Sequence, residues 1–297
     1  MNRGTLYGIA AYALWGLFPI YWKALGHVAA SEVLVHRMIW SLVFVALILT
    51  WRGQWAWLVA LRRRPRAMAV SALAAILLGV NWFLYIWGVT HDFVVETSLG
   101  YFITPILSVL LGVLLLRERL RGGQWAAVAL AAVGVFYLTL VYGSLPWIAL
   151  TLAFTFGLYG YLKKRVSLSS LESLTAEMMA LFTPALIYLL WLMSRGEAAF
   201  GQADAATHLL LVAAGMVTAV PLLLFGAAAR RVPLSALGIL QYLAPTLQFL
   251  LGVLLYHEPF TTAHLTGFIL IWLALAVYTI DGLRHRQPRP SAHHGGR

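Results

Sequence analysis

A few ionisable side chains stand inside long apolar runs of this sequence, and they are its main candidates for chemistry. Glu32, His36 and Arg37 fall at the start of one such run, with Glu32 and His36 spaced i, i+4 on one helix face. Glu96 stands near the start of another run, and Glu177 lies within a third. Because a charged group is costly to bury among apolar residues, each is expected to line a pathway or to pair with another polar group.

Arg37 and Glu96 are the oppositely charged residues expected at the most similar depth in the membrane. Arg37 lies about seven residues into its apolar run, which is roughly 10 Å along a helix, and Glu96 is expected at a similar depth. One interpretation is an ion pair that only fixes helix packing, with Glu32 and His36 solvated at the membrane surface. The other is that Arg37 contacts a substrate. Glu32, Glu96 and Glu177 are the candidates for carrying a coupled proton.

Uncharged polar and aromatic residues within the apolar runs are further candidates to line a cavity. Asn81 lies near the middle of its run, where an interhelical hydrogen bond is the simpler interpretation and a substrate contact the alternative. Gln241 and Tyr242 lie together just before a proline. The other aromatic candidates, for which ordinary packing is the alternative role, are Trp15, Tyr101 and Tyr159.

No catalytic or metal-binding motif is present in the sequence. It contains no HExxH, no Walker loop and no GxSxG, and its lack of cysteine excludes thiolate chemistry. His257 and Glu258 are adjacent, but the second histidine of a zinc site is missing. We therefore expect no catalytic residue, no metal and no cofactor, and an enzyme is disfavoured.

The elements that position these residues are predicted to be transmembrane helices. Hydrophobic residues make up 62% of the chain and charged residues 10%, far from the balance of a soluble protein. The fold class is therefore an all-α integral membrane protein with about ten spans, and residues 55–58 form an interfacial turn. The expected spans are 5–25, 30–51, 67–90, 93–116, 125–143, 145–162, 170–193, 207–229, 232–256 and 263–281.

The basic residues are concentrated in alternate loops between these spans. The formal net charge is +11, and about 18 of the 21 Lys and Arg fall on one side of the predicted membrane, including those at 52–66, 117–121, 163–165 and 230–231. By the positive-inside rule, that side and both termini are cytoplasmic, and the chain is placed in the plasma (inner) membrane. Because the charge is divided among membrane-facing turns, nucleic acid is not an expected partner.

The chain contains an internal repeat with an offset of roughly 140 residues. Residues 105–118 match residues 245–258 at about nine of fourteen positions, sharing LLGVLL and a later glutamate. The predicted halves are 1–143 and 144–283, followed by a disordered cytoplasmic tail at 284–297. Each half holds about five spans, and an odd number inverts the second half in the membrane.

Several segments, above all EVLVHRMIWS, SLGYF and LQYLAPTLQF, resemble the RarD group of EamA-type transporters in the drug/metabolite transporter superfamily. The resemblance covers nearly the whole chain. It implies a ten-helix carrier whose central cavity is lined by the first, third, fourth, sixth, eighth and ninth spans. It adds weight to the cavity candidates other than Arg37, whose helix the family places more peripherally.

The function expected from these features is secondary transport, with export of small metabolites or drugs by alternating access. No motif for ATP hydrolysis is present. The alternatives are a lipid-headgroup translocator and, less favoured, a membrane scaffold or enzyme. The expected partners are a small-molecule substrate and the lipid bilayer. The oligomeric state is left open, with a homodimer as one option.

Overall fold

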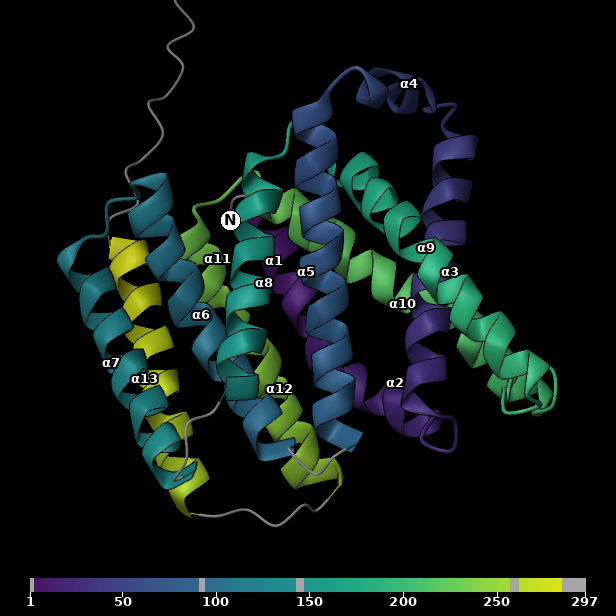
Figure 1. Ribbon diagram of the computed structural model, residues 1–297. Helices are drawn as coiled ribbons and strands as arrows, with labels where there is room; N and C mark the ends of the chain where they lie inside the picture. Colours follow the sequence, from purple (N-terminus) through teal and green to yellow (C-terminus); the bar gives the residue numbers. More distant parts are fainter. Residues whose placement is uncertain (1–2, 91–93, 143–146, 257–261, 285–297) are drawn as a thin grey trace, which may run out of the picture.

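Apolar helices form almost the whole of the computed structural model, which describes residues 3–90, 94–142, 147–256 and 262–284 (Figure 1). No strand occurs in these ranges. In chain order the helices are α1 (Arg3–Gly16), α2 (Phe18–Ala24), α3 (Ala30–Trp51), α4 (Ala56–Arg62), α5 (Pro65–Thr90), α6 (Val94–Leu116), α7 (Gly122–Tyr142), α8 (Trp147–Arg165), α9 (Ser170–Ser194), α10 (Ala205–Ala229), α11 (Leu234–Gln241), α12 (Leu243–Leu250), a π-helix (Leu251–Leu255) and α13 (Thr262–Arg284).

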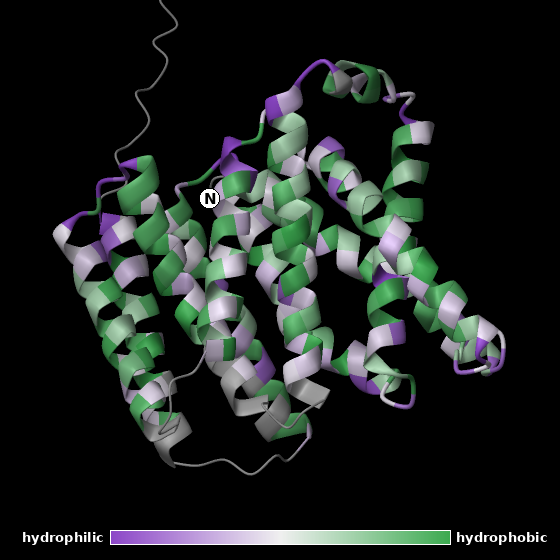
Figure 2. Ribbon diagram, viewed as in Figure 1, coloured by the Kyte–Doolittle hydropathy of each residue, from purple (hydrophilic) through white to green (hydrophobic). Residues whose placement is uncertain are grey.

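The predicted class, an all-α integral membrane protein, is confirmed. By length and composition, α3, α5, α7, α9, α10 and α13 each contain a stretch able to cross a membrane. The other apolar helices are α1 with α2, α6, α8, and α11 with α12. Helix bodies are hydrophobic on most of their surface, and hydrophilic residues gather at helix ends and connections (Figure 2). This is the distribution that a lipid environment requires.

Two expected spans are wrong as continuous helices. Residues 5–25 divide at Leu17 into α1 and α2, and residues 232–256 divide at Tyr242 into α11 and α12. A proline follows each break, Pro19 and Pro245, and proline both lacks an N–H and crowds the carbonyl four residues earlier. The other spans match the observed helices to within about three residues, and the expected turn at 55–58 overlaps the short helix α4.

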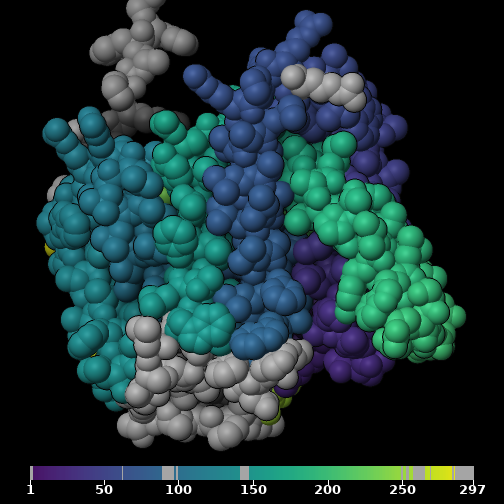
Figure 3. Space-filling model, in the orientation of Figure 1, coloured from purple at the N-terminus to yellow at the C-terminus, as the bar shows by residue number. Residues whose placement is uncertain are grey.

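The helices pack in the pattern that a two-fold relation between the halves requires. With the repeat offset, α1, α3, α5, α6 and α7 correspond to α8, α9, α10, α11–α12 and α13. Contacts obey this correspondence: α6 packs on α8 while α11 and α12 pack on α1, and α3 packs on α10 while α9 packs on α5. Figure 3 shows α5 between α8 and α9 on the face in view.

Three pairs of counterpart helices also touch each other, α3 with α9, α6 with α11 and α7 with α13, and they run antiparallel. The carboxylate of Glu32 at the start of α3 accepts hydrogen bonds from backbone groups just beyond the end of α9. Arg121, just before α7, pairs with Asp281 at the end of α13 at 2.8 Å. Glu118, just after α6, accepts hydrogen bonds from Leu234 and Ser235 at the start of α11. Antiparallel counterparts are what an inverted repeat produces.

Candidate functional site

A cavity of about 440 Å³ lies where the two halves meet. From the first half it is lined by α1, α2, α3, α5 and α6, and from the second half by α8, α10, α11 and α12. These include all six spans that the family resemblance implies, and α3 is added to them. A cavity of this size between helices of a bundle suits a small molecule.

The structure brings together five of the eight residues named as cavity candidates. Those on the cavity wall are Trp15, Arg37, Asn81, Tyr101 and Gln241. Tyr159 and Tyr242 are fully buried instead, and within the described chain neither lines this cavity. Glu96 belongs to α6, but its side chain lies outside the described part of the structure. Its approach to Arg37 and its coupling role therefore stay predictions.

Several wall residues were missed from the sequence, and most of them are aromatic or polar. They are Tyr12, Phe18, Trp22, Lys23, Trp82, Tyr85, Thr104, Phe156, Thr218 and Gln248. Helical spacing carries a signal for some of them. Tyr85 follows Asn81 by four residues, so the two share a face of α5. Gln248 follows Gln241 by seven residues, a spacing that would place both on one face of a continuous helix.

Arg37 reaches the cavity from α3 and is held by three side chains. Its Nε donates a hydrogen bond to Thr218 Oγ1 at 3.0 Å, across to α10. The guanidinium carbon lies 4.7 Å from the ring centroid of Trp22 and 4.6 Å from that of Trp82. Two aromatic faces at this distance attract a cation and fix its position. Tyr85 and Tyr101, which border the same cavity, pack against each other with ring centroids 5.7 Å apart.

Asn81 joins two helices on the cavity wall. Its Nδ2 donates to Leu152 O and to Thr155 Oγ1, both at 2.9 Å, so the amide ties α5 to α8. These contacts are the interhelical hydrogen bond that is the simpler interpretation of Asn81 from the sequence. Because Asn81 also borders the cavity, the alternative of a substrate contact stays a prediction.

The helix breaks at Leu17 and Tyr242 place polar groups beside the cavity. Pro19 cannot donate to the carbonyl of Trp15, and that carbonyl instead accepts a hydrogen bond from Gln248 Nε2 at 3.1 Å. The Gln241 side chain is only 6% exposed and borders the cavity, and no hydrogen bond to it is found in the described structure. A buried amide of this kind is a candidate contact for a bound molecule.

An aromatic cluster lies at one end of the cavity, and three of its five residues line the wall. We call Tyr12, Trp15, Phe156, Tyr159 and Phe225 the aromatic plug. Their rings touch in a continuous chain, with centroid distances from 5.5 Å for Tyr12–Trp15 to 6.2 Å for Tyr12–Phe225. Tyr159 and Phe225 stack at 5.9 Å with an interplanar angle of 12°. Along α8 and α10, Tyr159 and Phe225 lie between the residues that line the cavity and the basic ends of these helices at 163–165 and 230–231.

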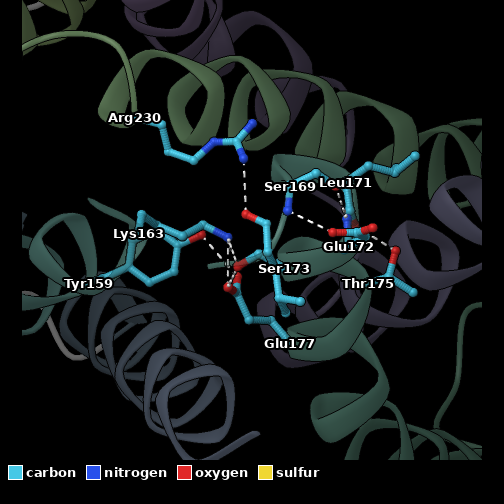
Figure 4. A network of polar contacts seen from close by, with 10 residues as sticks. Tyr159, Lys163, Ser169, Leu171, Glu172, Ser173, Thr175, Glu177 and Arg230 are labelled. Atoms are coloured by element: carbon cyan, nitrogen blue, oxygen red, sulfur yellow. Dashed lines mark hydrogen bonds and ion pairs between the residues drawn. The ribbon is translucent and has the colours of Figure 1, made fainter. Parts of the chain in front are cut away.

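Beyond the plug lies a buried ion pair (Figure 4). Lys163 Nζ is 2.6 Å from Glu177 Oε1 and 2.9 Å from Ser173 Oγ, and Tyr159 donates its hydroxyl to Glu177 Oε2. The side chains of Lys163 and Glu177 are 2% and 0% exposed. Counting Lys163 among the loop cations was therefore wrong, because its stem extends inward from the last turn of α8. Glu177 is a candidate for proton coupling only through this pair.

Glu32 and His36 are neither solvated nor on the described cavity wall. Both are 1% exposed, which makes the expectation of surface solvation wrong. Glu32 accepts hydrogen bonds from the amides of Ala199 and Phe200, at 2.9 and 2.8 Å, because the loop after α9 folds over the start of α3. His36 Nδ1 accepts from Trp40 Nε1 at 3.1 Å. This arrangement fastens a loop to a helix end.

Comparison with known proteins identifies a family whose members resemble this chain. The EamA-like transporter family matches the chain twice, at residues 2–140 and 145–280. A protein named RarD from Streptomyces exfoliatus is 51% identical over 95% of this chain and 90% of its own length. The uncharacterized transporter YojE of Bacillus subtilis is 44% identical over 98% of both. A solved crystal structure has a TM-score of 0.72 at 20% identity, covering 96% of this chain and 100% of that one, and shows a shared fold.

Proposed function

The chain belongs to the EamA-like transporter family, and we propose that it exports small metabolites or drugs across a bacterial inner membrane by alternating access. It is a multi-pass membrane transporter; the substrate class, the direction and the mechanism are the proposal. The observation that carries the proposal is a cavity built jointly by helices of the two repeats, with the aromatic plug at one end.

Alternating access requires two packings of similar energy that expose the same cavity to opposite sides. The two repeats supply related sets of contacts, and α1–α2 and α11–α12 border the cavity at their breaks. A break in a helix lets one segment move without the other. In the proposed orientation both termini and the basic loops are cytoplasmic, so the aromatic plug blocks the cytoplasmic side and the cavity lies on the outer side of it.

The test is an untargeted comparison of metabolites in medium and cytosol, using cells that overexpress the chain. Ala244 borders the cavity from α12, and Ala244→Phe places a ring inside it. Ala129 is exposed on α7, away from the cavity wall, and Ala129→Phe is the matched control. We expect one compound class to accumulate outside with the wild type and the control, and this accumulation to be lost with Ala244→Phe at equal membrane levels.

The remaining outcomes separate the alternatives. If cells expressing the wild type instead take a compound class up, the proposed direction is wrong while transport stands. If metabolites are unchanged and labelled lipid headgroups cross between leaflets of proteoliposomes, the chain is a lipid translocator. If neither compounds nor lipids move, the proposal fails.

A further inference from the structure

Arg37 is a buried cation whose environment is incomplete. The residue is 9% exposed, and its contacts within the described structure are one hydrogen bond from Nε and the rings of Trp22 and Trp82. A guanidinium has five N–H donors in a planar fork. Four of them therefore lack a protein acceptor among the described residues. Because Arg37 borders the cavity, a bound molecule can supply acceptors for them.

The described cavity wall has the charge of a site for anions. Arg37 is the cation whose guanidinium borders it from α3, and none of its described residues is a carboxylate. Lys23 also borders the cavity, but its charge has interactions of its own, among them the ring of Tyr256 at 3.3 Å from Nζ, so only Arg37 is assigned to an anion. Uncompensated charge deep in a membrane protein is costly, so an incoming anion that pairs with Arg37 removes part of that cost.

The rest of the wall indicates what accompanies the negative charge. Aromatic rings approach from several helices, with Trp15, Tyr101 and Phe156 joining the two tryptophans beside Arg37. Flat apolar groups pack well between such rings. Gln241 adds a buried amide that can exchange hydrogen bonds with a polar substituent.

We propose that Arg37 binds the carboxylate of the transported molecule, so that the substrate class is small organic carboxylates with an aromatic or similarly flat apolar body. The two carboxylate oxygens match the terminal N–H groups of the guanidinium fork. Trp22, Trp82 and Thr218 hold the fork in place before the ligand arrives. This inference rests on the proposed function, because it assigns the ligand of the same cavity. The competing view is that Arg37 only fixes helix packing, through Thr218 on α10 and through the predicted ion pair with Glu96.

Ligand binding to purified protein in detergent separates the two views. Radiolabelled benzoate, 3-phenylpropionate and indole-3-acetate are the probes, and unlabelled 3-phenylpropionate, 3-phenylpropanamide and 2-phenylethylammonium compete against them. These competitors differ in charge while keeping a phenyl ring on a short chain. We expect the amide to compete about 10- to 100-fold more weakly than the carboxylate, and the ammonium not to compete. This comparison uses the wild-type chain alone.

Variants then locate the charge. Arg37→Gln should lose carboxylate binding, and Arg37→Lys should bind with intermediate affinity because it keeps the charge without the fork. Arg195→Gln is the matched control, since Arg195 also lies over a tryptophan, at 5.3 Å from the Trp191 ring, but is 56% exposed and outside the cavity wall. It should bind like the wild type.

Three results would overturn the inference: no saturable binding of any probe to the wild type, equal competition by carboxylate and amide, or full affinity in folded Arg37→Gln. These outcomes do not depend on the export experiment. Metabolite export without carboxylate binding would remove only the substrate assignment. Carboxylate binding through Arg37 without movement of any compound would remove only the proposed transport.

Discussion

Removing either partner of the Lys163–Glu177 ion pair should destabilise the protein strongly. Lys163→Met keeps most of the stem but leaves the Glu177 carboxylate, 0% exposed, with hydroxyl donors only from Ser173 and Tyr159. Glu177→Leu leaves an ammonium group without its carboxylate at 2.6 Å. Loss of one partner of a buried pair typically costs about 3–5 kcal/mol, because the other charge stays buried. We expect each single variant to fall in that range.

The double variant tests whether the cost comes from the orphaned charge. Lys163→Met with Glu177→Leu removes both charges and fills the space with apolar atoms, so its loss of stability should be smaller than that of either single variant. The assay is reversible unfolding of the purified chain in mixed micelles, titrated with a denaturing detergent and followed by far-UV circular dichroism. Arg195→Met, which breaks the exposed pair with Glu197, should change the unfolding midpoint very little.

The energetic role assigned to this pair would be refuted if the stability losses of the two single variants were small and simply added in the double variant. If each single variant lost less than about 1 kcal/mol and the double variant lost their sum, Lys163 and Glu177 would behave as an exposed pair. The burial and the 2.6 Å distance would then have no energetic meaning.

The remaining predictions concern the contacts between the repeats. Gln248→Leu leaves the Trp15 carbonyl without its hydrogen-bond donor and should lower the free energy of unfolding by about 1–3 kcal/mol in the same micelle titration. Glu118→Ala removes the acceptor for the first amides of α11 and should cost about 1–3 kcal/mol, whereas Glu118→Gln should retain part of it; equal losses would contradict a capping role. Gly215→Ala should cost about 1–3 kcal/mol in melting experiments because an added Cβ meets the backbone of α3, whereas Gly122→Ala, with no neighbour within 4 Å, should be neutral.

Sequence reasoning predicted helices well and side-chain directions less well. Length and apolar composition fix where a helix can lie in a membrane, so most spans agreed closely with the structure. Depth alone does not say which way a side chain faces. Gln241 and Tyr242 are adjacent, and successive helical residues point about 100° apart, so the two do not share a direction. Gln241 borders the cavity, while Tyr242 is buried and donates its hydroxyl to Phe102 O.

Long-range partners account for most of the other differences. Glu32 lies at a helix start, where exposure is the simple expectation. Its carboxylate nevertheless accepts hydrogen bonds from backbone amides more than 160 residues later in the chain. Lys163 belongs to a basic stretch, and only the approach of α9 shows why one of its cations turns inward. Neither the amides that bind Glu32 nor the carboxylate that binds Lys163 can be predicted from the spacing of residues within one helix.

The contacts between counterpart helices bear on how such a chain can arise. The pairs α3 with α9, α6 with α11 and α7 with α13 are the contacts that two identical five-helix chains would make if they inserted into the membrane in opposite orientations. An ancestor of that kind would depend on equal amounts of each orientation. Joining two copies into one gene removes this dependence, and each half is then free to change its own sequence. The cation at Arg37 and the carboxylate at its repeat position, Glu177, illustrate that divergence.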